Sequence, residues 1–197
     1  LNVLQLFISA TLLLLAYGIS FFAFGIKISL ILISLAIAIV FYFLRRLLNN
    51  NKIINLLIPS VAASILFSFV LNLGIMKPLL KFQSQSNAAV FIKENNYESL
   101  DLYLYNENEK AKSRSFNFYL DKNIKFIDSN YLQDEFNPRP QLVFTNENGL
   151  KELKDNKNNF KIIEVFNHVR VSKLTPSFIN PKTRHKVLKK KYLLRFI

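Results

Sequence analysis

The sequence predicts an α-helical membrane segment with three transmembrane spans, followed by a small α/β domain outside the cytoplasm. Two observations lead to this fold class. Residues 1–76 hold only four charged residues, and none of the 13 acidic residues of the chain precedes Glu94. Residues 77–197 mix short apolar runs with charged residues, as water-soluble domains do. This segregation excludes a fully soluble protein and a disordered chain, and the absence of cysteine excludes a disulfide scaffold.

The membrane segment begins with two apolar runs, which we expect to form one transmembrane helix each. They cover 3–26 and 28–44, and together they exceed the roughly 20 residues that cross a bilayer. The chain must therefore reverse between them. The expected turn is 25–27, because it contains a glycine and the only charge, and Gly18 is the second choice. Backbone groups in lipid must be paired within their own segment, so these runs are predicted to be helices rather than strands.

The third apolar run covers 53–76 and contains Pro59 in its first turns, where a proline disturbs a helix least. We expect this run to leave the membrane near Asn72 and Gly74 and to end at Lys77-Pro78. The alternative for all three runs is a buried helical bundle in a soluble protein. It is disfavoured because soluble helices of this length have a polar face.

The orientation follows from the short segment 45–52, which carries Arg45, Arg46 and Lys52 and no acidic residue. Short loops rich in basic residues lie in the cytoplasm, whereas the turn at 25–27 has a single lysine. Residues 77–197 are then predicted to lie outside the cytoplasm. We interpret the three basic residues as membrane-surface residues whose side chains reach the headgroups.

An α/β domain with a mostly parallel sheet is expected over 77–174, because helical and extended patterns alternate there. Residues 115–120 leave two alternatives, a strand from their alternation or a short helix capped by Ser115. The other expected elements are a helix over 85–95 capped by Ser84, with Ala88, Phe91 and Ile92 on one face, strands over 100–105, 124–127 and 141–145, a helix from Asn146 to about Asp155, and a hairpin of 160–166 with 169–174 around Asn167-His168.

The last residues, 175–197, are predicted to form a basic tail. Residues 173–197 contain eight basic residues and no acidic one, whereas residues 77–172 are nearly neutral, with 14 basic and 13 acidic residues. The positive charge therefore belongs to the ends of the chain, which argues against a nucleic-acid-binding domain. Lys189, Lys190 and Lys191 are candidates for contact with an anionic membrane surface. We favour the alternative, a solvated and partly disordered tail.

No catalytic or metal-binding constellation stands out in the sequence. His168 and His185 are 17 residues apart and have no cysteine or paired carboxylates at ligand spacing, so no metal site is expected. His168 is interpreted as a turn residue. The four glycines are dispersed, which excludes the usual phosphate-binding loops. Five carboxylates spread through the soluble part are each interpreted as part of a solvated face: Asp101, Asp121, Asp128, Asp134 and Glu135.

Several short segments carry a resemblance to a known family. They are Lys77-Pro78-Leu79, Ser84-Gln85-Ser86, Leu102-Tyr103-Leu104-Tyr105, Ser115-Phe116-Asn117-Phe118-Tyr119-Leu120 and Leu142-Val143-Phe144-Thr145. In this order they resemble the C-terminal end of the bacterial polyprenyl-phosphate-dependent glycosyltransferases. This is the GT-C superfamily, which includes the dolichyl-phosphate-mannose protein mannosyltransferases and the lipid A aminoarabinose transferases. In that family a short periplasmic α/β domain follows the last membrane helix, and the resemblance covers residues 30–172.

The resemblance implies an inverting transfer of a sugar from a polyprenyl-phosphate carrier to a lipid, glycan or protein acceptor, at the inner membrane of a bacterium. The chain starts at Leu1 within an apolar run, and we interpret it as the C-terminal fragment of such an enzyme. The catalytic acid of the family lies in the first external loop, so no catalytic residue is assigned here. We expect this fragment alone to have no enzymatic activity and no cofactor.

Ser115 and Tyr119 are, by the same resemblance, candidates for residues that face the acceptor cavity. The alternative, which we favour for Tyr119, is that its ring packs into the domain core with its hydroxyl satisfied. A second hypothesis for the whole chain is a non-enzymatic, membrane-anchored α/β module such as a subunit or a sensor. A transporter half is disfavoured, because no span carries a buried charge for ion coupling.

Overall fold

The computed structural model describes residues 2–25, 27–48, 52–106, 114–122, 124–133, 141–170 and 174–197. The chain divides into two compact units. The helical unit consists of Leu1–Leu80 with Leu174–Lys186, and the α/β unit consists of Lys81–Lys173 with Val187–Ile197. The predicted boundary at residue 76 is therefore displaced, because the third long helix runs to Leu80. The predicted boundary at residue 174 does not separate a tail from a domain, because Leu174–Lys186 belongs to the helical unit.

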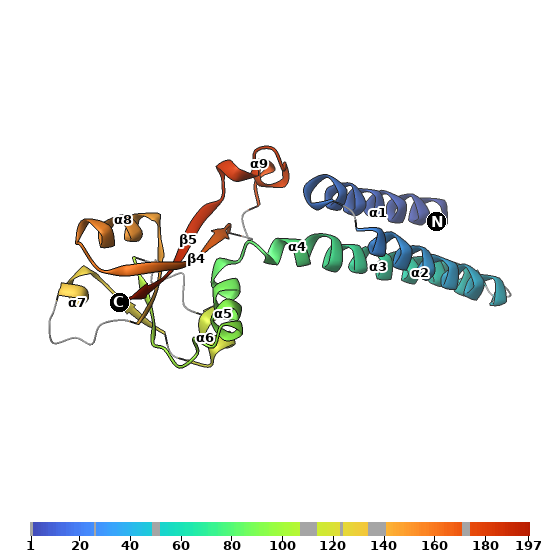
Figure 1. Ribbon diagram of the computed structural model, residues 1–197. Coiled ribbons are helices and arrows are strands. Elements are labelled where there is room, and N and C mark those ends of the chain that lie inside the picture. Colours follow the sequence, from blue (N-terminus) through green and yellow to red (C-terminus); the bar gives the residue numbers. More distant parts are fainter. Residues whose placement is uncertain are drawn as a thin grey trace. The chain divides into compact units, whose positions relative to one another are not determined.

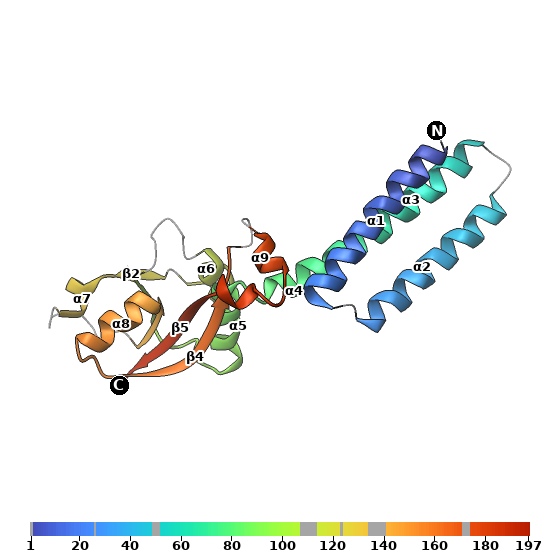
Figure 2. The same ribbon diagram turned by 90° about the horizontal axis from the view of Figure 1, so that it is seen from above.

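Three long apolar helices form the helical unit (Figure 1). They are α1 (Asn2–Phe24), α2 (Ile28–Leu47) and a third helix made of α3 (Lys52–Val70), a π-helical turn (Leu71–Met76) and α4 (Lys77–Leu80). Each is long and apolar enough to cross a membrane, which confirms the prediction of three long apolar helices in this part of the chain. Both α1 and α2 contact α3, and the three helices run in nearly the same direction or its reverse in Figure 2. Large apolar side chains such as Phe7 and Leu14 point outward, 69% and 73% exposed, as lipid-facing residues do.

The turn between α1 and α2 lies where the sequence predicts it. Gly25 has a φ of +75°, a conformation that glycine adopts without strain. The expected end of the third helix at Lys77-Pro78 is wrong, since the helix continues to Leu80. Pro78 follows the π-helical turn, where the regular hydrogen-bond ladder is already interrupted and the missing N–H is tolerated.

The segment from Leu174 to Lys186 is an ordered part of the helical unit rather than a tail. It contains α9 (Pro176–Ile179), whose N-terminus is capped by Thr175, and a 3-10 turn (Arg184–Lys186). Arg184 donates hydrogen bonds to the carbonyl oxygens of Phe178 and Ala23. Its guanidinium carbon also lies 5.1 Å from the ring centre of Phe24. A cation at the C-terminal end of α1 complements the helix dipole.

A five-stranded sheet forms the centre of the α/β unit, in the order β2-β1-β3-β5-β4. Its strands are β1 (Leu102–Tyr105), β2 (Lys125–Ile127), β3 (Leu142–Asn146), β4 (Phe160–His168) and β5 (Lys189–Phe196). β1 is parallel to β2 and to β3, whereas β5 is antiparallel to β3 and to β4. The sheet is therefore mixed, and the expectation of a mostly parallel sheet holds only for its first three strands.

The predicted hairpin and the predicted disordered tail are both wrong, and for the same reason. β4 pairs along its length with β5, from Phe160 opposite Phe196 to His168 opposite Lys189, and the described residues of the segment that follows it, 169, 170 and 174, do not belong to a strand. Of the expected partner 169–174, residues 171–173 lie outside the described part of the chain. β5 lies between two strands, and its Leu193 and Leu194 are fully buried on opposite faces of the sheet.

Helices cover both faces of the sheet. α5 (Ser84–Glu94) and α6 (Arg114–Leu120) pack on one face over Leu104, Phe144 and Leu193. α8 (Glu147–Asp155) packs on the other face over Val143 and Leu194, and the short helix α7 (Ser129–Gln133) follows β2. The helical alternative for 115–120 is thus the right one, and the strand alternative is wrong. The predicted cap is also wrong, because the helix begins at Arg114 and Ser115 lies inside it.

The predicted start of one helix and the predicted cap of another have different outcomes. α8 begins where the sequence predicts it, directly after Asn146, which caps the helix because its side chain accepts a hydrogen bond from the Gly149 N–H at 2.9 Å. Ser84 is not the cap of α5, since the residue at that position is Gln83. The Ser84 side chain is instead buried, with its Oγ 2.9 Å from Nδ1 of His168 at the end of β4.

Candidate functional site

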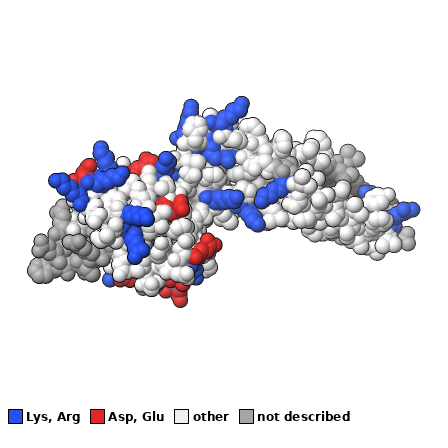
Figure 3. Space-filling model, in the orientation of Figure 1, with Lys and Arg blue, Asp and Glu red and all other residues white. Residues whose placement is uncertain are grey.

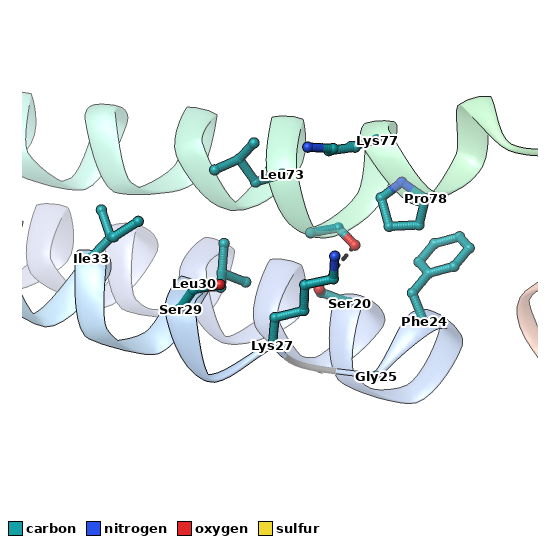
Figure 4. Close-up of a pocket in the computed structure, with 11 residues that line it drawn as sticks. Ser20, Phe24, Gly25, Lys27, Ser29, Leu30, Ile33, Leu73, Lys77 and Pro78 are labelled. Atoms are coloured by element: carbon teal, nitrogen blue, oxygen red, sulfur yellow. Dashed lines mark hydrogen bonds between the residues drawn. The ribbon is translucent and has the colours of Figure 1, made fainter. Parts of the chain in front are cut away.

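A pocket lies at the end of the helical unit where α1 ends and α2 begins. Its volume is about 150 Å³. It is lined by Ser20, Phe24, Gly25, Lys27, Ser29, Leu30, Ile33, Leu73, Gly74, Lys77 and Pro78. Figure 4 shows the Lys27 side chain reaching from the turn toward the third helix, which carries Lys77. Three helices therefore contribute to one pocket, with an ammonium group on two of its sides.

Small side chains bring α1 and the third helix together beside this pocket. The Ser20 hydroxyl is buried and donates a hydrogen bond to the Gly74 carbonyl oxygen at 3.0 Å. Gly74 is buried, and a Cβ atom there would overlap Ser20 Oγ. Close approach at small residues is the usual way in which membrane helices pack. The contact fixes the positions of the backbone segments that carry Lys27 and Lys77.

The charge around this pocket is entirely positive. Both lysines are exposed, and no lining residue is acidic. The sequence of the whole helical unit contains eight basic residues and no acidic one. Lys27 is the N-cap residue of α2, and its ammonium, which has no acceptor, cannot cap the N–H groups at the start of that helix. The first N–H groups of a helix lack intrahelical acceptors and attract anions. The arrangement is suited to a negatively charged group.

Apolar surface surrounds the charged end of the helical unit. Most of the visible surface of the long helices is uncharged, whereas charged side chains are spread over the α/β unit (Figure 3). Ile28, directly after Lys27, is 75% exposed, and Leu73 is 41% exposed. If an anionic group is attached to a long apolar chain, the anion can contact the lysines and the apolar chain can contact the exposed apolar residues beside them. The site therefore fits the phosphate of a membrane lipid better than a free anion.

The predicted cavity-facing residues lie on α6, in the other unit. Ser115 is half-buried, and Tyr119 is 39% exposed with its ring edge against Phe118. The alternative that Tyr119 packs into the core is therefore wrong. Neither residue lines the pocket at the end of the helices. A role for them in acceptor contacts stays a prediction.

The predicted membrane-surface residues fall into two groups. Arg45 and Arg46 are exposed in the last turn of α2, and Lys52 begins α3. The other group, Lys189 to Lys191, begins β5. Lys189 and Lys190 are exposed, but Lys191 is only 9% exposed, so the prediction of a surface role is wrong for Lys191.

Sequence reasoning missed Lys27 and Lys77 as a pair because it treated each as a boundary of an apolar run. A signal was present in the sequence. The predicted topology places both lysines at helix ends on the same side of the membrane. Among the described residues, no group of three His, Cys, Asp or Glu side chains could hold a metal ion. In comparisons with known proteins, no family model, no curated protein and no solved structure matches the chain.

Proposed function

We propose that this chain is part of a membrane glycosyltransferase that takes a sugar from a polyprenyl-phosphate carrier, and that the pocket at the end of the helices holds the carrier phosphate. The observation that carries the proposal is the pair Lys27 and Lys77 around a pocket without any acidic residue. The resemblance of the sequence to the GT-C transferases supplies the reaction type. The resemblance also supports an inner-membrane position in a bacterium.

The proposed role of the lysines is to bind and stabilise the phosphate. When the sugar leaves the carrier, negative charge increases on the phosphate oxygen of the broken bond. Ammonium groups placed beside that oxygen stabilise the transition state more than the ground state. Ser29, in the first turn of α2, adds a hydroxyl donor to the pocket lining. The base that activates the acceptor must come from elsewhere, because the sequence of the helical unit has no acidic residue.

The charge distribution supports an extracytoplasmic position for this pocket. The opposite end of α2 carries Arg45 and Arg46, which the positive-inside rule assigns to the cytoplasm. Because α2 crosses the membrane, Lys27 at its start is then on the outer side. A cysteine introduced at Asn148, an exposed residue of α8, tests this orientation. The sequence has no other cysteine, so an impermeant thiol reagent should label this position in intact cells.

Lipid binding provides the main test. The chain in nanodiscs that contain polyprenyl phosphate is compared with a Lys27→Gln/Lys77→Gln variant, using the phosphorus NMR signal of the lipid. Charge-assisted hydrogen bonds contribute about 1.5–3 kcal/mol each, so we expect the variant to bind at least about tenfold more weakly. An Arg45→Gln/Arg46→Gln variant removes the same charge from the other end of α2 and should bind normally.

Two results would contradict the proposal. Equal losses in both double variants would show only general attraction to anionic lipid. Normal lipid binding combined with no sugar transfer from any polyprenyl-phosphate donor, in the intact enzyme, would leave the non-enzymatic anchored module as the better explanation.

A further inference from the structure

A second pocket lies in the α/β unit, at the carboxyl ends of β1 and β2. Its volume is about 450 Å³. It is lined by Tyr105, Asn106, Phe126, Ile127, Asp128, Ser129, Tyr131 and Glu152. β1 has β2 on one side and β3 on the other, so the parallel strands that follow β1 lie on opposite sides of it. In open α/β sheets, ligands bind outside the carboxyl ends of the strands at such a point.

Tyr105 extends beneath α8 and contributes a buried hydroxyl group. The residue is 1% exposed. A Cβ atom on Gly149 of α8 would lie 3.0 Å from its ring, so the helix sits close on the end of β1. Among the described residues, none completes a hydrogen bond of normal geometry with the Tyr105 Oη, although the Glu152 carboxylate lies close enough to raise the pKa of this hydroxyl. A buried hydroxyl without a partner is costly and uncommon in folded proteins. A ligand in the pocket that accepts this hydrogen would remove the cost.

Two carboxylates give the pocket a negative charge. Asp128 follows β2, and its Oδ1 accepts a hydrogen bond from the Tyr131 N–H at 2.9 Å. Glu152 lies on α8, and its Oε2 accepts a hydrogen bond from the Asn106 side-chain amide at 3.3 Å. None of the eight described lining residues is basic, so the pocket itself supplies no cation to either carboxylate.

The protonation state of Tyr105 fits a donor role. Burial raises the pKa of Tyr105 above its ordinary value, and the Glu152 carboxylate raises that pKa further. The hydroxyl therefore keeps its proton at neutral pH. Within the described part of the chain, no three His, Cys, Asp or Glu side chains form a group that could hold a metal ion.

We infer that this pocket binds a small organic cation, whose protonated primary amine contacts Asp128 and Glu152 and whose neighbouring oxygen accepts the hydrogen of the Tyr105 hydroxyl. The inference concerns a different unit from the proposed lipid-phosphate pocket and does not depend on it. The selectivity follows from charge. A neutral molecule of the same shape brings no positive charge to the two carboxylates, and an anion is repelled.

Glucosamine and glucose are the matched probes, because they differ at one position, an amine in place of a hydroxyl. We expect saturation-transfer NMR with the whole chain in detergent micelles to detect protonated glucosamine and not glucose. Ethanolamine serves as a second amine probe. The Glu152→Gln and Asp128→Asn variants should each weaken glucosamine binding by at least about tenfold. Asp155→Asn removes a carboxylate from an exposed position on the same helix and should bind as the unmodified chain does.

The Tyr105→Phe variant separates binding from folding. If the hydroxyl has no partner in the fold, its removal should leave the thermal stability unchanged or raised and should weaken glucosamine binding. A clear loss of stability would show that the hydroxyl is satisfied within the protein, and would overturn the argument from Tyr105. Equal binding of glucose and glucosamine, equal effects of Glu152→Gln and Asp155→Asn, or no binding of either amine would overturn the inference as a whole.

Discussion

Replacing Leu194 with alanine tests the placement of β5 within the sheet, which the sequence did not predict. Leu194 is fully buried and lies opposite Val143 of β3 and Ile162 of β4. Its side chain packs in the cluster that contains Tyr105, Leu150 and Leu153. Truncating a fully buried leucine removes favourable burial and leaves a cavity, at a cost of about 2–5 kcal/mol.

The expected size of the effect is large enough to measure in the whole chain. A loss of about 3 kcal/mol in the free energy of unfolding corresponds to a faster backbone amide exchange of roughly a hundredfold, since about 1.4 kcal/mol is tenfold. The acceleration should occur in peptides that cover β3, because strand pairing transmits the loss to the neighbouring strand. Hydrogen exchange measured by mass spectrometry in mild detergent gives this local resolution without separating the two units.

Lys190→Ala provides the control on the same strand. Lys190 is exposed, and its truncation should change exchange in β3 by less than about twofold, as surface substitutions do. If Leu194→Ala changes exchange in residues 142–146 no more than Lys190→Ala does, β5 does not pair with β3. The solvated-tail interpretation would then be restored.

The remaining predictions concern one contact in each unit. Gly74→Ala should force α1 and the third helix apart, because the added methyl group overlaps Ser20, and should lower stability in detergent by about 1–3 kcal/mol. Gly18→Ala meets no atom within 4 Å and should have little effect on the same thermal unfolding measurement. Burial lowers the pKa of His168 below its usual 6.5, and the positive charges of Lys191 and Lys189 lower it further. The unfolded chain then binds a proton at a higher pH than the folded chain, so stability should fall as the pH drops below about 6.5. His168→Gln should remove this dependence, His185→Gln should keep it, and an unchanged pH profile in His168→Gln would contradict the assignment.

The membrane helices could be predicted from the sequence because the signal is local. A bilayer demands apolar side chains over the full length of each span, and the runs before residue 77 satisfy that demand. Gly25 marks the turn for an equally local reason, its positive φ. The end of the third helix could not be predicted in the same way. The π-helical turn at Leu71–Met76 lets the helix continue through Pro78, and the composition gives no sign of such a turn.

The strand β5 depends on contacts between residues that are far apart in the sequence. Its lysines, Lys189 to Lys191, resemble a solvated tail, and only pairing with β3 shows that the following residues form the centre of the sheet. Ser84 illustrates the same limit. A serine before an apolar run is typical of a helix cap, but this side chain contacts His168, a residue 84 positions later.

The pocket in the α/β unit shows what would have been needed to find it from the sequence. Asn106 and Asp128 each directly follow a short parallel strand, and the carboxyl ends of parallel strands share one edge of the sheet. A polar residue at that position in two successive strands is therefore a stronger signal of a site than an isolated carboxylate, which is usually a solvated surface group. Glu152 is the third polar residue of the pocket. It reaches the pocket because α8 packs closely on the end of β1, where Gly149 lies beside Tyr105. The same glycine that permits this close approach thus allows three distant segments to line one pocket.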